Sequence, residues 1–445
     1  MEKLLKSAEK HKQLILDAER YIWNNPETGF KEYKTSAYMA KIFEELGYTL
    51  TYAENIPGFY TTIDTGRPGP TLLIMGEMDS IICPEHKEAD KETGAVHSCG
   101  HNVQCAALIG IAAALKDECA LDDLSGKIKL CAVPAEELLE IEYRSELKAK
   151  GIIKYLGGKG EFLYRGYFDD VDLAFMVHAS KGFRVSAGSV GCIAKKISYI
   201  GKASHAGGSP WNGCNALYAA TCGLNAVNAI RETFKEKDII RVHPIMTNGG
   251  VMVNAIPGRA DIESYVRGAS FEAMREANQK VNRAFCGAAL SLGANIEIND
   301  MPGYAPLQND RNMMKVAEEA LELALPDIEY EINDKIGSGS TDMGDICSVM
   351  PAIHPYSAGT EGTSHGSDYY VTDPELACVG GAKFQLGMLY ILLKDNAERA
   401  KKIVEEYKAP FASKQEYFDY IDTISTNSKR INYREDGIAE VDIKI

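Results

Sequence analysis

The segment "TLLIMGEMDS" (residues 71–80) sets the pattern on which the fold depends. Its first part is almost continuously apolar, which is typical of a strand buried on both faces in the middle of a parallel sheet. "KIKLCAV" (127–133) and "DLAFMV" (172–177) repeat the pattern. The sequence therefore predicts a sheet with several fully buried strands.

Helical patterns separate these strands. The first fifty residues have a helical pattern with a break at Pro26 and Gly29, and residues 103–115 form an apolar helical segment between two of the strands. A further helical pattern covers about 310–325. This alternation predicts an α/β fold in which helices cover both faces of the sheet.

The pattern changes near Gly188. "GSVGCIAKKISYIG" (188–201) alternates apolar and polar residues, as in a sheet with one face in water. Up to about residue 300 the patterns follow in the order strand, helix, two strands, helix, strand, which predicts a compact α+β unit inserted into the larger domain. "MPGYAP" (301–306) is expected to be the return linker.

Size and charge limit the possible partners. A chain of 445 residues is long enough for two or more domains. Its net charge of -15 argues against a general affinity for nucleic acid or for an anionic membrane. The N-terminal residues lack a signal-peptide apolar core, and the eleven cysteines include no Cys-x-x-Cys pair. These features predict reduced thiols and a cytoplasmic location.

Candidate ligands follow the predicted strands or lie in glycine-rich loops. In open α/β sheets, ligands bind beyond the carboxyl ends of the strands. The candidates are Asp79, Cys99, His101, Glu136, Glu137, His178 and His365. Thiolate, imidazole and carboxylate are ligands of zinc-like divalent metals. This many donors suits two cations roughly 3.5–4 Å apart that activate a bridging water. Of two adjacent glutamates, one can bind metal while the other takes the water's proton.

Each of these residues also has an ordinary explanation. Asp79 alone is compatible with a turn or a helix cap, and a lone histidine at a strand end is more often structural. Cys99 and His101 could form a nucleophile–base pair, which is the main chemical alternative. That pair leaves the two glutamates and His365 unexplained, so the joint placement favours a metal centre.

With these residues identified, the chain resembles the two-metal amidohydrolases of the aminoacylase, carnosinase and glutamate-carboxypeptidase superfamily, the clan MH metallopeptidases. "VHSCGHN" (96–102), "VPAEE" (133–137) and "SHGSDY" (364–369) carry the resemblance and indicate the cysteine-containing branch. "STDMGD" (340–345) and "AIHPYS" (352–357) are similar to p-aminobenzoyl-glutamate hydrolase subunits and to dipeptidases that cleave β-alanyl-lysine-type dipeptides.

The resemblance implies a phosphorylase/hydrolase-like mixed sheet flanked by helices, with an inserted ferredoxin-like α+β lid and dimerisation domain. The expected segments are two parts of a catalytic domain (1–188 and 303–406), the inserted domain (189–302) and a C-terminal extension (407–445). The metal ligands it implies are Cys99, His101, Glu137, His178 and His365. They are expected to hold two divalent ions of zinc, manganese, cobalt or nickel.

Further roles also come from the resemblance. Glu136 would be the general base, and Asp79 a carboxylate that orients a metal ligand. His205, in "SHAG" (204–207), would stabilise the developing oxyanion in the partner's active site of a homodimer formed through the lid. Three residues would contact substrate, with the arginine gripping a carboxylate: Asn254, Arg267 and Asp342.

The expected activity is metal-dependent hydrolysis of the amide bond of an N-acyl amino acid or a dipeptide. In this reaction a metal-activated water attacks the carbonyl carbon and Glu136 transfers the proton. Two alternatives stay open. One is an aryl-amide hydrolase of the p-aminobenzoyl-glutamate kind, and the other is a catalytically silent relative that binds a ligand or a partner subunit.

Overall fold

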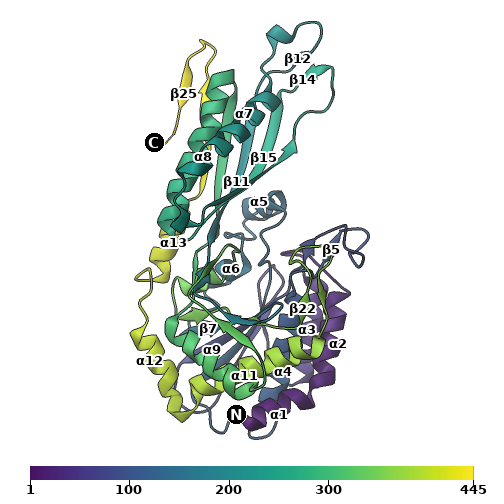
Figure 1. Ribbon diagram of the computed structural model, residues 1–445, viewed down its shortest axis with the longest axis vertical. Helices are drawn as coiled ribbons and strands as arrows, with labels where there is room; N and C mark the ends of the chain where they lie inside the picture. Colours follow the sequence, from purple (N-terminus) through teal and green to yellow (C-terminus); the bar gives the residue numbers. More distant parts are fainter. Residues whose placement is uncertain (444–445) are drawn as a thin grey trace. The chain divides into compact units, whose positions relative to one another are not determined.

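The computed structural model describes residues 1–443, which divide into two compact units (Figure 1). The first unit consists of Met1–Gly188, Leu307–Ile336 and Thr341–Ala412. The second consists of Ser189–Pro306, Gly337–Ser340 and the described residues from Ser413 onward. The four segments expected from the sequence stay a prediction.

The first unit is built on a six-stranded sheet in the order β1-β2-β6-β3-β7-β20. The strands span Thr51–Tyr52, Phe59–Asp64, Lys127–Val133, Thr71–Glu77, Leu173–Phe175 and Ala352–Ile353, in that order. β6, β3, β7 and β20 run parallel, whereas β2 pairs antiparallel with β6. Every residue of β3 is buried, as its apolar sequence predicted. The expected mixed α/β sheet is therefore confirmed.

Helices pack against this sheet and form the main core with it. Those of the first unit are α1 (Glu2–Lys10), α2 (Lys12–Trp23), α3 (Tyr33–Glu45), α4 (His101–Lys116), α5 (Ile141–Ala149), α6 (Gly158–Tyr164), α9 (Arg311–Ala324), α10 (Met343–Cys347), α11 (Gly381–Leu393) and α12 (Glu398–Glu406). α4 is central, because it contacts β3, α2 and α11 and buries fifteen of its sixteen residues.

Among residues 1–443, one helical segment is long and apolar enough to cross a membrane, namely Glu375–Leu393, which ends in α11. Since 83% of its most apolar window is buried inside the protein, its composition is that of a core helix. Its apolar face packs against α4 and α9.

The second unit has an antiparallel sheet in the order β13-β15-β11-β16-β24-β25. The first four strands are Arg241–Asn248, Arg259–Gly268, Gly191–Ile200 and Asn295–Tyr304. Helices α7 (Ala216–Ala229) and α8 (Phe271–Leu292) pack against β11 and β15. The elements follow the order expected from the sequence, but Met301–Tyr304 continues β16 instead of forming a linker, with Met301 paired to Ala194.

The C-terminal segment completes this second sheet. It contains α13 (Lys414–Asp422), β24 (Thr426–Tyr433) and β25 (Ala439–Val441). β24 pairs antiparallel with β16, and Ile431 is fully buried in the core of the unit. The segment therefore covers one edge of the sheet and leaves β13 at the other edge.

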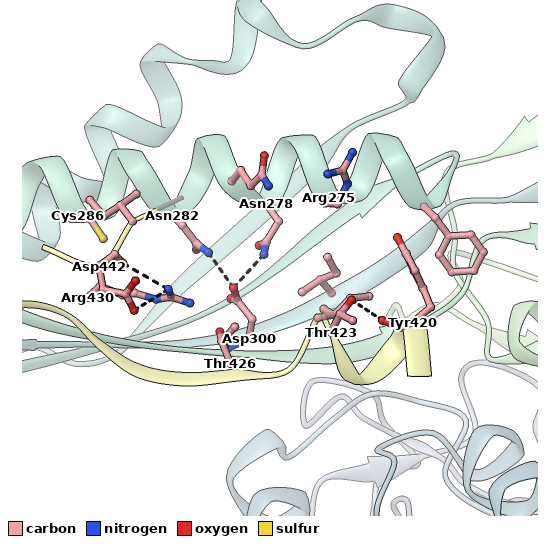
Figure 2. Close-up of a pocket in the computed structure, with 15 residues that line it drawn as sticks. Arg275, Asn278, Asn282, Cys286, Asp300, Tyr420, Thr423, Thr426, Arg430 and Asp442 are labelled. Carbon is pink, nitrogen blue, oxygen red and sulfur yellow. Dashed lines mark hydrogen bonds and ion pairs between the residues drawn. The ribbon is translucent and has the colours of Figure 1, made fainter. Parts of the chain in front are cut away.

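A cavity of about 310 Å³ lies between α8, β16 and the C-terminal segment (Figure 2). Asp300 lines it and accepts hydrogen bonds from Asn278 at 2.9 Å and from Asn282 at 2.8 Å. Its other carboxylate oxygen forms an ion pair with buried Lys195. A buried charge pair with this many hydrogen bonds avoids most of the penalty of an unpaired buried charge.

Candidate metal centre

The turn before α4 places two donor side chains side by side. Gly100 separates Cys99 from His101 and has a φ of +86°. A Cβ atom at Gly100 would lie 2.3 Å from the Tyr369 hydroxyl oxygen, so only glycine fits both the conformation and the space. Cys99 is 7% exposed and His101 is fully buried.

The hydrogen bonds of His101 fix the orientation of its ring. Its Nδ1 lies 2.9 Å from the Asp79 carbonyl oxygen and 3.2 Å from Asp79 Oδ1. Both atoms are acceptors, so Nδ1 carries a proton and donates it. Nε2 then faces the Glu77 carboxylate, with Oε2 at 3.1 Å.

His178 and His365 approach Cys99 in the same way. His178 Nδ1 lies 2.7 Å from the Ala179 carbonyl oxygen and donates to it, which leaves Nε2 facing Cys99 Sγ at 3.4 Å. His365 Nε2 lies 3.3 Å from Cys99 Sγ and 3.0 Å from Glu137 Oε1. His365 has a φ of +65°, and its backbone N–H donates to Ser98. Such a strained backbone is typical of a functional position.

These side chains fit a pair of metal ions. Imidazole lone pairs that face a thiolate or a carboxylate repel it unless a proton or a cation lies between them. The donor atoms of Cys99, His101 and His178 all lie within 4.8 Å of one another, and so do those of Cys99, Glu137 and His365. Cys99 belongs to both groups, so it would help to hold either cation. The donor set is that of zinc-like metals.

Burial and neighbouring charges set the protonation of the donors. Burial and the Glu137 carboxylate act to raise the pKa of the Cys99 thiol, but His101 and His178 outweigh them and lower it to about 6. Burial also acts to raise the pKa of Glu137, but His365 outweighs it and lowers that pKa to about 2. Both groups are therefore anionic near neutral pH, as ligands must be.

Glu136 differs from its neighbour Glu137. It is 6% exposed, and its Oε2 lies 3.9 Å from His101 Nε2. Burial raises its pKa well above the ordinary value, and the Glu77 and Glu137 carboxylates raise it further. A carboxylate that holds its proton more tightly than usual is suited to accept and return one.

Two buried residues of this region were missed by the sequence analysis. Glu77 ends β3, and Lys159 lies in α6; both are fully buried. The Lys159 ammonium forms ion pairs with Glu77 and with Asp342. The signal available in the sequence was weak, because Lys159 stands in "GGKGEF" (157–162), which resembles an ordinary glycine-rich loop.

Asp342, which was expected to contact substrate, is bound by Lys159. It is fully buried, and both of its carboxylate oxygens are bound by Lys159: one by the side chain and the other by the backbone N–H at 2.9 Å. Burial raises the pKa of Asp342 to about 6, despite the opposing effect of Lys159. Lys159 therefore fixes this carboxylate in place, and the expected substrate contact of Asp342 stays a prediction.

Three further candidates belong to the second unit, namely His205, Asn254 and Arg267. His205 and Asn254 are exposed, and His205 Nδ1 accepts hydrogen bonds from the N–H groups of Gly207 and Gly208 at 3.1 and 2.9 Å. Arg267 lies on β15, with its guanidinium 5.6 Å from the centre of the Tyr265 ring. Their expected roles stay predictions.

A cavity of about 610 Å³ opens beside His178 within the first unit. Arg184 and Tyr356 line it, and the Arg184 guanidinium lies 4.3 Å from the centre of the Tyr356 ring. Among the described residues, no group accepts a hydrogen bond from buried Arg184 Nε. The cavity therefore offers a cationic group close to a donor of the metal centre.

Comparisons with known proteins identify relatives of the chain. The Xaa-Arg dipeptidase of Mus musculus is 29% identical over 360 residues, which cover 79% of this chain and 78% of that protein. One of the p-aminobenzoyl-glutamate hydrolase subunits of Escherichia coli (strain K12) is 28% identical over 301 residues, covering 65% of this chain and 58% of that protein.

A solved structure has the same fold. The YXEP protein of Bacillus subtilis, a dinuclear metal binding peptidase from the M20 family, matches with a TM-score of 0.64 and 19% identity, covering 86% of this chain and 99% of that one. The family model of peptidase family M20/M25/M40 matches residues 73–389, a range that contains both donor groups. This match over most of the chain confirms the resemblance inferred from the sequence: the protein belongs to peptidase family M20/M25/M40 and is a metal-dependent hydrolase.

Proposed function

We propose that this protein uses two divalent metal ions to hydrolyse dipeptides or N-acyl amino acids that carry a free carboxylate. The observation that carries the proposal is the pair of donor groups that share Cys99, with the Glu136 carboxylate beside them. One ion would be held by Cys99, His101 and His178, and the other by Cys99, Glu137 and His365. Zinc, manganese, cobalt and nickel all suit these donors. When bound, such ions polarise the scissile carbonyl and lower the pKa of a coordinated water.

The chain's own carboxylates would carry the proton. Glu136 Oε2 lies 3.9 Å from His101 Nε2, beside the donor groups, and its raised pKa favours acceptance and return of a proton. Its carboxylate would take the proton from water and pass it to the leaving amine. Asp79 would act as a positioning residue that keeps the Nδ1 proton on His101.

Residues of the second unit would complete the site through a homodimer. Because His205 Nδ1 accepts two backbone N–H groups, neutral His205 carries its proton on Nε2, where it can donate to an oxyanion. Asn254 and Arg267 would contact substrate. β13 supports a homodimer, since it is an edge strand and its Ile245 is 61% exposed.

We also propose a cytoplasmic location, which the eleven free thiols support.

A dipeptide is the favoured substrate class. The dipeptidase relative matches 78% of its own length, whereas the p-aminobenzoyl-glutamate hydrolase relative matches 58%. The cavity beside His178 supports a substrate with a carboxylate, because Arg184 can receive it. An aryl-amide substrate of the p-aminobenzoyl-glutamate kind is the second candidate, supported by the similarity to that relative.

The test measures turnover of a panel of substrates. The protein is first stripped of metal and then reconstituted with zinc, manganese, cobalt or nickel. The panel contains a β-alanyl-lysine-type dipeptide, Xaa-Arg dipeptides, acetyl-amino acids and p-aminobenzoyl-glutamate. Turnover of dipeptides that disappears on chelation and in Glu136→Gln supports the proposal. Two bound ions per chain without turnover of any substrate would instead indicate a catalytically silent, ligand-binding protein.

A further inference from the structure

A chain of buried charges leads from Asp342 through Lys159 to Glu77 and ends at the metal centre. We propose that Glu77 is an additional ligand of a metal ion bound at His101 Nε2, and that Lys159 and Asp342 hold its carboxylate in place. This inference rests on the proposed function, because it concerns the same metal centre.

The first argument is the contact between Glu77 and His101. His101 donates from Nδ1 to Asp79, so Nε2 is the nitrogen that is left to bind a cation. Glu77 Oε2 lies 3.1 Å from Nε2, so a proton or a metal ion must lie between the two atoms. A cation bound to Nε2 at about 2.0–2.1 Å, the usual zinc–imidazole distance, can also be within reach of this oxygen. The donor atoms of Glu77, His101 and Glu136 lie within 4.8 Å of one another.

The second argument is the fixed orientation of the Glu77 carboxylate. Gln104 donates a hydrogen bond to Glu77 Oε2 at 2.7 Å, and Lys159 forms an ion pair with Oε1. Each carboxylate oxygen has two lone pairs, so Oε2 keeps one that can bind a cation. Metal-binding carboxylates are held by hydrogen bonds of this kind.

The third argument is the balance of buried charge. Glu77, Lys159 and Asp342 are all fully buried. Two carboxylates share one ammonium, so the remaining negative charge has to be balanced at His101, by a proton or by a metal ion. Glu77 lies at the end of the chain of charges that faces His101. A metal ion there would balance the charge, and Lys159 would limit how strongly Glu77 binds it.

A Co²⁺ titration of the metal-free protein tests the proposal, followed by calorimetry and by visible absorption of the bound ion. Wild-type protein is expected to bind two Co²⁺ per chain. In Glu77→Gln, the affinity of one site should fall by about 10- to 100-fold, and the absorption bands of that ion should shift. Lys159→Met should change the same bands, because it releases the Glu77 carboxylate. Unchanged affinities and bands in Glu77→Gln would overturn the proposal.

Two controls separate the possible outcomes. Lys195→Met removes an equally buried lysine from the second unit, so it should leave both Co²⁺ sites intact. If Glu77→Gln does not fold, Glu77→Asp decides, because it keeps a charge opposite Lys159 but shortens the reach to the ion. If Cys99→Ser loses both Co²⁺ sites while the Glu77 variants bind Co²⁺ normally, this inference is wrong and the proposed function stands. If the wild type does not bind two ions, the proposed function is wrong.

Discussion

Asp79 accepts a hydrogen bond from the backbone N–H of Glu137 at 2.7 Å through Oδ2, while its Oδ1 lies 3.2 Å from His101 Nδ1. One fully buried carboxylate therefore connects a donor of the first group with a donor of the second. Because α4 supplies His101 and the segment after β6 supplies Glu137, this contact fixes the distance between two separate elements.

Asp79→Asn should weaken metal binding more than it destabilises the fold. The amide cannot accept a hydrogen bond at both of its terminal atoms, so either His101 or Glu137 loses its partner. We expect metal affinity to fall by about 10- to 100-fold, measured by titration of the metal-free protein. An unchanged affinity would contradict the positioning role of Asp79.

Glu136→Gln should abolish most turnover without removing metal. Loss of a general base typically costs about 10²- to 10⁴-fold in rate, and Glu136 is not needed in either donor group that contains Cys99. The measurement is kcat together with metal content per chain. Glu142→Gln, which changes a carboxylate on the exposed side of α5, is the control and should keep normal turnover. Metal loss in Glu136→Gln would reassign this residue as a ligand.

Chelation should lower the melting temperature as well as the activity. Ions that bind only the folded protein stabilise it, by about 2.7 kcal/mol for each site at a free concentration one hundred times Kd. Differential scanning calorimetry of the protein before and after removal of metal checks this, and adding metal back should restore both properties. An unchanged melting temperature after removal of metal would contradict a metal centre that joins separate elements through His365, His178 and Glu137.

Part of the candidate metal centre was predictable from the sequence, because Glu137 and His178 follow strands whose apolarity identifies them. β3, β6 and β7 are buried, and parallel strands present their carboxyl ends at one edge of a sheet. That rule alone brings Asp79, Glu137 and His178 together.

Glu77 and Lys159 escaped prediction for a physical reason. A charged residue is normally exposed, and only a partner can make its burial tolerable. The partner of Lys159 is Asp342, which lies 183 positions further along the chain. No local pattern reports such a pairing. β24 escaped for a similar reason, because its strand pairing with β16 joins segments far apart in the sequence.

Ile431→Ala should destabilise the second unit. Ile431 is fully buried in the core of that unit, and truncating a buried isoleucine to alanine typically costs about 2–5 kcal/mol. Val441→Ala is the matched control, because Val441 lies on the neighbouring strand β25 and is 52% exposed. Urea unfolding followed by circular dichroism gives both values. Equal effects of the two changes would mean that the C-terminal segment does not contribute to the core.

Asp117 should make part of the stability of the first unit depend on pH. It accepts hydrogen bonds from Ser7 and Lys10 of α1 and lies 3.3 Å from His11 Nε2. Burial acts to raise the pKa of Asp117, but these partners outweigh it and lower the pKa from 3.8 to about 2. Because the folded protein has the lower pKa, the ionised carboxylate stabilises it fully above about pH 4.

This contribution should be lost as the pH falls through the interval from 3.8 to about 2, where the folded protein takes up the proton. At pH 6 the urea midpoint of the wild type should therefore exceed that of Asp117→Asn. As the pH falls, the difference between the two midpoints should disappear. Asp64→Asn, which removes a 62% exposed carboxylate, corrects for the general effect of acid. A constant difference between wild type and Asp117→Asn at all pH values would show that ionisation of Asp117 does not stabilise the contact with α1.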